Sequence, residues 1–219
     1  MNEIFTNTKN IAIVCNNQAG KGKAVSITKH LQQKLQRLQI PFSVFENSAP
    51  ENFDPFTSAL IVGGDGTLNY FINQHPHISI PIALFKGGSG NDFAWKLYGD
   101  KTVDEYFEIV LNGSVKKVDA GICNGSRYGG GFMVAPQAFV DDGFLDIMLI
   151  KRIASFMRFF YVPKVEKGMH LNFDFVEAGK SKKVFIKSSE KVATHLDGEQ
   201  MEANEFEIEI LEGKFLFYC

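Results

Sequence analysis

Short runs of consecutive apolar residues alternate with a helical pattern over the first half of the chain. The runs at 10–15, 41–45, 59–62 and 80–85 are brief and contain few polar residues, as expected for strands buried on both faces of a parallel sheet. Between the first two runs, residues 25–38 space their apolar side chains mostly three or four apart, which predicts an amphipathic helix. This alternation predicts a parallel sheet with right-handed crossovers.

The pattern changes near Asp119. Before it, residues 103–111 predict a helix that ends at Asn112-Gly113, and residues 116–122 predict a strand. Beyond it, short runs with alternating polarity predict half-exposed antiparallel strands. The strands are predicted at 132–135, 145–150, 183–186, 206–211 and 214–218, with one helix at 153–162. The predicted fold class is α/β, with a parallel-sheet domain over 1–118 and a β-rich, sandwich-like domain over 119–219.

Length and composition restrict the class of protein. A chain of 219 residues, 45% of them hydrophobic, can bury one large core or two modest ones. Its formal net charge of −2 argues against a nucleic-acid partner, which usually requires a strongly basic surface. Three widely spaced cysteines without a CxxC pair favour reduced thiols in a cytoplasmic protein. Neither a signal peptide nor a transmembrane segment is expected.

The stretch Ala59–Asn69 (ALIVGGDGTLN) joins a buried strand to a helix through three glycines. Glycines let the backbone turn sharply and approach a ligand closely, and Thr67 is predicted to cap the helix. The amides and positive dipole end of a helix start favour phosphate. Asp65 would repel a phosphate unless a cation lies between them, so its presence points to a bound Mg²⁺ or a bridging water. A plain Gly-Asp-Gly turn without a ligand is an equal alternative.

Two further turns follow predicted strands. Lys86–Ala94 (KGGSGNDFA) differs from a dinucleotide fingerprint because Phe93 stands where the third glycine should be. Asn16–Lys23 (NNQAGKGK) differs from a Walker-type loop because Ala24 replaces the Ser or Thr, so phosphate contact and a solvated turn remain alternatives. Turns at the carboxyl ends of neighbouring parallel strands line the crevice where open α/β sheets bind ligands. Together these turns predict a ligand site.

Four motifs resemble those of a known family. They are GGDGTLN (63–69), GGSGNDFA (87–94), GGGFMVAPQAFVDDGFLD (129–146) and LDGE (196–199). In this order they resemble the diacylglycerol kinase catalytic family, especially its soluble bacterial lipid kinases, which are related to sphingosine kinases. NAD kinases and phosphofructokinase-like enzymes share GGDG, but the two later motifs separate this chain from NAD kinases. The resemblance covers nearly the whole chain and implies an NAD-kinase/phosphofructokinase-like nucleotide-binding domain.

The resemblance implies an ATP- and Mg²⁺-dependent kinase that phosphorylates a hydroxyl group of diacylglycerol or a similar lipid. The implied nucleotide-binding residues are Gly63, Gly64, Gly66, Thr67, Ser89 and Asn91. Asp65 and Asp92 resemble the aspartates that organise catalytic Mg²⁺ directly or through water. Asp142 is similar to a structural Mg²⁺ ligand of the family, with the main-chain carbonyls of Phe139 and Phe144 as its companions.

Glu199 resembles the general base that takes the proton of the lipid hydroxyl. A carboxylate fits there, because phosphoryl transfer needs charge neutralisation, in-line positioning and an acceptor for one proton. Asp197-Gly198 by itself predicts a type I′ hairpin turn, as any Asp-Gly between strands does. The local pattern favours the plain turn, and the resemblance favours catalysis.

The chain also departs from the family pattern. Asn16-Asn17 stands for the usual Asn-Pro, and Lys86–Ser89 stands for Pro-Leu-Gly-Thr, which adds a cation near the predicted site. Residues 120–129 join two stretches that several strands and a helix separate in relatives. The second domain is therefore predicted to be shortened where the family shapes its lipid cleft. An apolar edge left by this loss would favour a homodimer.

Residues 151–167 combine cations with interleaved aromatic residues. The cations are Lys151, Arg152, Arg158, Lys164 and Lys167, and the aromatic residues are Phe156, Phe159, Phe160 and Tyr161. A basic, aromatic helix could rest on an anionic membrane, where the protein would meet a lipid substrate as a peripheral protein. The alternative, which an apolar stripe at helical spacing favours, is a helix whose aromatics cover the sheet while its charges face water.

Two functions of different class follow from these observations. The first is a cytoplasmic, ATP- and Mg²⁺-dependent lipid kinase of diacylglycerol kinase type. The second is a catalytically weak relative that binds nucleotide and acts by interaction, or a kinase for a non-lipid alcohol. Retention of Asp65, Asp92, Asp142 and Glu199 favours the enzyme, whereas the shortened second domain favours the alternative.

Overall fold

The computed structural model describes residues 9–113, 115–120, 126, 132–196 and 199–219, with the backbone alone at Leu196 and Glu199. The chain divides into two compact units. Unit 1 comprises Met1–Lys116 and Leu216–Cys219, and unit 2 comprises Lys117–Phe215. The chain therefore leaves unit 1 once and returns to it with its last residues, a return that the predicted division after residue 118 does not include.

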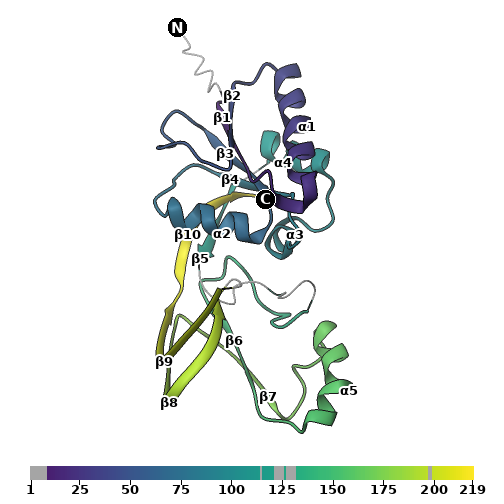
Figure 1. The fold of residues 1–219 in the computed structure, drawn as a ribbon, viewed down its shortest axis with the longest axis vertical. Helices are drawn as coiled ribbons and strands as arrows, with labels where there is room; N and C mark the ends of the chain where they lie inside the picture. Colours follow the sequence, from purple (N-terminus) through teal and green to yellow (C-terminus); the bar gives the residue numbers. More distant parts are fainter. Residues whose placement is uncertain (1–8, 114, 121–125, 127–131, 197–198) are drawn as a thin grey trace. The chain divides into compact units, whose positions relative to one another are not determined.

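Unit 1 is built on a six-stranded sheet with the strand order β2-β1-β3-β4-β10-β5 (Figure 1). The strands are β1 (Ile11–Cys15), β2 (Phe42–Glu46), β3 (Ser58–Gly63), β4 (Ile82–Lys86), β5 (Val115–Ala120) and β10 (Leu211–Tyr218). Strands β2, β1, β3 and β4 run parallel, with Ile11 opposite both Phe42 and Ser58. Every residue of β1 and β3 is buried. The predicted parallel sheet of apolar strands is thus confirmed.

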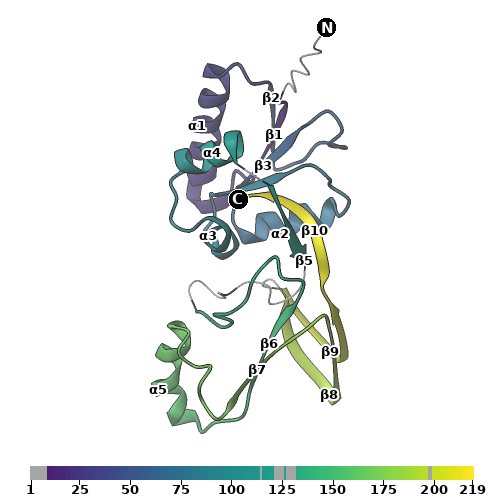
Figure 2. The ribbon, with the colours of Figure 1, turned by 180° about the vertical axis from the view of Figure 1, so that it is seen from behind.

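The helices of unit 1 cover both faces of this sheet. They are α1 (Lys23–Arg37), α2 (Asp65–Gln74), α3 (Asp92–Tyr98) and α4 (Val103–Asn112), with a short 3₁₀ turn, η1, at Ala19–Gly22. The crossovers from β1 to β2 and from β3 to β4 run in opposite directions, so right-handed connections put α1 and α2 on opposite faces. Helix α4 lies beside α1, where Lys34 Nζ is 2.7 Å from Asp104 Oδ1 and lies over the Phe107 ring (Figures 1 and 2).

The last strand completes the sheet of unit 1. Phe217 pairs in parallel with Ile82 of β4, and its 2% exposed ring packs edge-on against Phe93. The Tyr218 hydroxyl and Ser58 Oγ form a buried hydrogen bond of 2.6 Å. The sequence predicted this strand but assigned it to the second domain, because a β-type run carries no information about which sheet it joins.

Unit 2 is rich in β-structure, as predicted. Strands β6 (Leu145–Ile150) and β7 (Val176–Ser181) form one antiparallel pair, and β8 (Lys183–Leu196) and β9 (Glu199–Glu209) form another. Helix α5 spans Ser155–Glu166 and includes Pro163. Among the described helices, none combines the length and the hydropathy needed to cross a bilayer.

Two predictions for unit 2 are wrong in detail. Residues 132–135 form no strand beyond a single bridge at Phe132. Strand β7 was not predicted, because its sequence VEAGKS is largely polar and exposed. Its hydrogen bonds come from the ladder with β6, which an apolar pattern does not reveal.

Candidate functional site

Three glycine-rich turns meet at the carboxyl ends of β1, β3 and β4 in unit 1. A Cβ atom added to Gly20 would lie 2.2 Å from the carbonyl oxygen of Gly87, and one added to Gly88 would lie 2.4 Å from the Cα of Gly64. The Gly87 amide donates to the Gly63 carbonyl at 2.8 Å. Since real Cβ atoms do not approach so closely, only glycine permits this assembly. The turns predicted from the sequence are therefore neighbours in space.

Part of this assembly is open to solvent. Gly66, Ser89 and Gly90 are exposed, and a Cβ added to Gly66 would meet nothing within 4 Å. Within the part of the chain that the structure describes, the backbone amides of these three residues have no hydrogen-bond acceptor. Gly66 lies in the first turn of α2, where unpaired amides and the helix dipole attract anions. The arrangement has the space and the donors that a phosphate group requires.

Thr67 lies within the first turn of α2 instead of capping it. The helix begins at Asp65 with Gly64 as its N-cap, so the prediction that Thr67 is the cap is wrong. The extended backbone of Gly64 already fulfils that role. Thr67 Oγ1 instead accepts a hydrogen bond of 3.1 Å from Asn16 Nδ2. This contact joins the loop after β1 to the start of α2, a role for Asn16 that its position after a strand did not indicate.

Asp65 links the second turn to the third through its carboxylate. Its Oδ2 accepts from the Asp92 amide at 2.8 Å, and its Oδ1 accepts from the Phe93 amide at 3.2 Å. Its own amide donates to the Gly90 carbonyl at 3.1 Å. Asp65 therefore caps the N-terminus of α3, which stabilises a helix start. This role could not be found locally, because the partners lie 27 and 28 residues further along the chain.

The other predicted residues of the third turn fall into two groups. Asn91 shapes the turn, since its Oδ1 accepts from the Gly88 amide at 3.3 Å and its Nδ2 donates to the Gly88 carbonyl at 2.8 Å. Ser89 is exposed beside the open amides, and Asp92 is half-buried in the first turn of α3. Asn91 and Asp92 are both half-buried, so Ser89 is the exposed residue of these three.

Whether this site fits Mg²⁺ depends on the donors that it offers. Among the described residues, no group of three or more His, Cys, Asp or Glu side chains could hold a metal ion. Mg²⁺ in nucleotide sites is usually held by one or two carboxylates together with phosphate oxygens and waters. The Asp65 carboxylate accepts two amide hydrogen bonds, whereas a carboxylate offers about four acceptor positions in all. The residues therefore fit a Mg²⁺ ion that arrives with a phosphate, and they do not form a cage that binds the ion alone.

Lys86 does not supply the free cation that the sequence suggested. Its Nζ donates to the carbonyl of Gly99, directly after α3. Burial lowers the pKa of Lys86 from its ordinary value, although the charge of Asp100 opposes this effect. The ammonium group thus stabilises the C-terminal end of α3, where a positive charge is favourable.

The predicted structural Mg²⁺ ligand in unit 2, Asp142, is paired with an ammonium group. Lys180 Nζ lies 2.5 Å from Asp142 Oδ2 and 3.6 Å from Asp146 Oδ2, and it lies over the Phe139 ring. The hydrogen bond to Asp142 raises the pKa of Lys180. Asp142 Oδ1 accepts from the Phe144 amide at 3.1 Å. As these residues lie, the position beside Asp142 is filled by Lys180, so they do not fit a bound Mg²⁺.

The predicted general base belongs to the β8/β9 pair of unit 2. Glu199 is the first residue of β9, and its backbone pairs with Leu196 of β8. Two residues separate these partners, as in the hairpin predicted from Asp-Gly. The Asp197-Gly198 dipeptide and the Glu199 side chain lie outside the described residues, as do residues 121–125 and 127–131. The role of Glu199 therefore stays a prediction.

Two family models match the chain. The model of the diacylglycerol kinase catalytic domain matches residues 10–123, which include all three turns. The model of the YegS C-terminal NAD kinase beta sandwich-like domain matches residues 103–215. The predicted order of a nucleotide-binding-type α/β part and a β-rich part is confirmed by these matches.

Curated relatives match over part of their length. A "Probable lipid kinase YegS-like" of Stenotrophomonas maltophilia (strain K279a) is 28% identical over 127 residues, which is 58% of this chain and 35% of the relative. A protein of the same name from Shewanella frigidimarina (strain NCIMB 400) is 31% identical over 107 residues, or 49% of this chain and 34% of the relative. The matched segments thus span about a third of these relatives.

Solved structures share the fold at low identity. A crystal structure of a diacylglycerol kinase from Bacillus anthracis strain Sterne has a TM-score of 0.75 at 19% identity and covers 96% of both chains. Another structure from the same organism has a TM-score of 0.79 at 20% identity, and the match covers 96% of this chain and 97% of that one. The two-part architecture therefore recurs in full in these proteins.

Proposed function

Because this chain belongs to the diacylglycerol kinase catalytic domain family, we propose that it transfers the γ-phosphate of ATP to a hydroxyl group of diacylglycerol or a similar lipid. One observation supports this most directly, namely the exposed amides of Gly66, Ser89 and Gly90, which lack protein acceptors among the described residues. Unpaired amides at a helix start and on an adjoining turn are the donors that hold nucleotide phosphates.

Each part of the site has a role in this proposal. The amides near Gly66 and Ser89 bind the phosphates, and Gly64 lets the third turn approach closely enough to share them. Asp65 and Asp92 orient the Mg²⁺ that accompanies ATP and offsets the phosphate charge. Asp65 also holds the start of α3 against the second turn through two amide contacts. Glu199 takes the proton of the attacking hydroxyl as general base.

Transfer of labelled phosphate tests the proposal. The full chain is incubated with γ-labelled ATP, Mg²⁺ and a total lipid extract, and the lipids are then separated. We expect a labelled lipid with the wild type and its loss in Glu199→Gln, with ATP affinity unchanged. Glu202→Gln, a change of an exposed glutamate on the same strand, is the matched control and should keep full turnover. Equal turnover in Glu199→Gln would remove Glu199 from its role.

Nucleotide binding is tested separately by calorimetric titration. Asp65→Asn should weaken Mg²⁺-dependent ATP binding, because it removes the negative charge that would attract Mg²⁺ to the phosphates and loosens two charge-assisted hydrogen bonds. The same titration with Mg²⁺ omitted is the control. Identical curves for Asp65→Asn and wild type under both conditions would contradict the assignment.

A second candidate is a nucleotide-binding relative without turnover or with a non-lipid alcohol as acceptor. It is favoured by the short stretch between Ala120 and Gly129, where the family resemblance implies a longer segment that shapes the lipid cleft. ATP binding without transfer to any lipid would support this candidate. Transfer to a water-soluble alcohol in the same assay would identify the acceptor class.

A further inference from the structure

Protein groups hold the turn at residues 139–144, which the family resemblance assigns to a structural Mg²⁺. The Asp119 carboxylate accepts from the Gly143 amide at 2.6 Å and from the Gly213 amide at 2.6 Å. The Asp119 amide donates to the Val140 carbonyl at 2.8 Å. Since Asp119 is 6% exposed, these hydrogen bonds lie largely out of water, where they are strong. The turn is therefore fixed at two of its residues by contacts that need no ion.

The register of the β6–β7 ladder places Lys180 beside this turn. Lys180 lies opposite Asp146 in the antiparallel pair, so the two side chains leave the sheet on the same face. From this position Lys180 Nζ lies 2.5 Å from Asp142 Oδ2 and 3.6 Å from Asp146 Oδ2, over the Phe139 ring. The place of the ammonium group thus follows from backbone pairing and is not a casual contact of a surface side chain.

The two carboxylates beside Lys180 are sheltered from water. The Asp146 side chain is 9% exposed and the Asp142 side chain is 27% exposed. Taking a carboxylate out of water is costly unless a cation or hydrogen bonds compensate it, and Lys180 gives both aspartates one shared cation. A Mg²⁺ ion at Asp142 Oδ2 would be repelled by that ammonium at short range. The ion could therefore bind only by displacing Lys180, which would deprive Asp146 of this cation.

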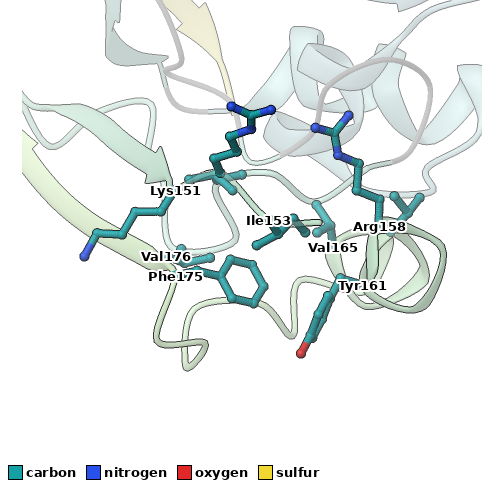
Figure 3. Close-up of a pocket in the computed structure, with 10 residues that line it drawn as sticks. Lys151, Ile153, Arg158, Tyr161, Val165, Phe175 and Val176 are labelled. Carbon is teal, nitrogen blue, oxygen red and sulfur yellow. The ribbon is translucent and has the colours of Figure 1, made fainter. Parts of the chain in front are cut away.

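The other end of the β6–β7 ladder has a lysine pair of equal length that is open to water. Lys151 directly follows β6, and its Nζ lies 2.5 Å from Glu177 Oε1, with both side chains more than half exposed. Figure 3 shows the Lys151 ammonium extending away from the hollow beneath α5. No residue of α5 is buried, so the alternative in which its aromatics cover the sheet is wrong. Because exposed pairs contribute little to stability, shelter and not distance distinguishes Lys180 from Lys151.

We propose that Lys180 is a built-in replacement for the structural Mg²⁺ that the resemblance assigns to Asp142. The ammonium group supplies the positive charge beside Asp142, and Asp119 holds the turn that the ion would otherwise order. Unit 2 therefore keeps its fold without a divalent cation. The Mg²⁺ that the chain uses is then only the ion that accompanies ATP in the proposed reaction.

Calorimetric titration with Mg²⁺ in the absence of nucleotide tests this inference. The full chain is first freed of divalent ions by dialysis against EDTA. We expect no saturable Mg²⁺ binding by the wild type. Lys180→Met should bind Mg²⁺ about tenfold or more tightly than the wild type, because the repelling charge beside Asp142 is gone. Lys180→Arg keeps a positive charge at this position and should behave as the wild type does.

The ladder itself offers a matched control. Lys151→Met breaks an ion pair of the same length at an exposed site and should not bind Mg²⁺. Adding Asp142→Asn to Lys180→Met should remove the binding that the single variant gains, because the ion loses its carboxylate ligand. Circular dichroism before and after dialysis checks that each variant is folded and that the wild type keeps its fold without divalent ions.

Two results would overturn the inference. One is the same titration curve for Lys180→Met and Lys151→Met, since removal of Lys180 would then open no site. The other is saturable Mg²⁺ binding by the wild type that Asp142→Asn abolishes, since the ion would then bind beside Lys180. Neither measurement uses ATP or lipid, so the result stands or falls separately from the proposed phosphoryl transfer.

Discussion

Asp65 in unit 1 and Asp142 in unit 2 were predicted to serve the same kind of ion, yet their carboxylates are held in different ways. Backbone amides at the start of α3 donate to Asp65, which closely follows the fully buried strand β3. The partner of Asp142 is the flexible ammonium group of Lys180. An amide group carries no net charge, whereas an ammonium group places a full positive charge beside the carboxylate. Whether a predicted aspartate can bind a cation therefore depends on which group the fold places beside its carboxylate.

The same contrast extends to the two units. Contacts between backbone atoms and a buried core position the turns of unit 1, whereas ion pairs and exposed rings dominate the surface of unit 2. Substitutions in unit 1 should therefore change stability through packing. Those in unit 2 should act through the loss of a charge or of an ion-pair partner. The predictions below test that difference in order of expected effect.

The largest effect is expected at Phe217. Phe217→Ala should lower the free energy of unfolding by about 3–5 kcal/mol, because a buried ring between β4 and α3 leaves a cavity. Urea denaturation measures this change. Phe185→Ala, at a ring that is 61% exposed in unit 2, should change stability by less than about 0.5 kcal/mol. If both variants lost a similar free energy of unfolding, the distinction between the packed core of unit 1 and the exposed rings of unit 2 would be wrong.

Substitutions at two glycines distinguish an effect on stability from an effect on ligand binding. Gly88→Ala should cost about 1–3 kcal/mol, since its Cβ would lie 2.4 Å from the Gly64 Cα. Gly66→Ala should leave stability nearly unchanged, because its Cβ meets nothing within 4 Å. If a phosphate lies against Gly66, this second variant should instead bind ATP more weakly. Titration and denaturation of both variants provide the measurements, and tight ATP binding by Gly66→Ala would argue against phosphate at that amide.

Lys180→Met sharpens the comparison between the two aspartates. Without the ammonium group, Asp142 and Asp146 lose the cation that they share, so stability should fall by about 1 kcal/mol or less at this partly exposed site. Added Mg²⁺ should then restore stability in the variant and have little effect on the wild type, because the position beside Asp142 becomes accessible. Thermal unfolding with and without Mg²⁺ measures this. Equal Mg²⁺ stabilisation of both proteins would show that the ion does not compete with Lys180.

The smallest effect is expected at the ion pair between α1 and α4. Hydrogen bonds from Lys34 and then His30 lower the pKa of Asp104 from 3.8 to about 2. A depressed pKa contributes stability that is present above pH 3.8 and is lost as the pH falls through about 2. The stability difference between wild type and Asp104→Asn that comes from this pKa shift should therefore be largest above about pH 5, shrink as the pH falls and disappear below about pH 2. Denaturation at several pH values tests this, and a difference that does not shrink between pH 5 and pH 2 would contradict it.

The buried part of the fold was largely predictable from the sequence. The strands with four or more consecutive apolar residues, such as Ile11–Cys15 and Ser58–Gly63, were found within one or two residues, because strands covered on both faces must be apolar throughout. The two turns after β3 and β4 were found for a related reason, since only glycines allow the observed approach of Gly88 to Gly64. The membership in the kinase family followed from these motifs.

The long-range partners were decided by the tertiary structure alone. Nothing near Asp65 in the sequence indicates that it caps α3, and nothing near Lys180 indicates its pairing with Asp142. Likewise, the pattern of β10 is that of any half-buried strand, yet its end enters the sheet of unit 1 beside β4. Periodicity and turn chemistry report on the burial and conformation of each residue, which are local. The choice of partner depends on which surfaces the folded chain brings together, and only the tertiary structure determines that.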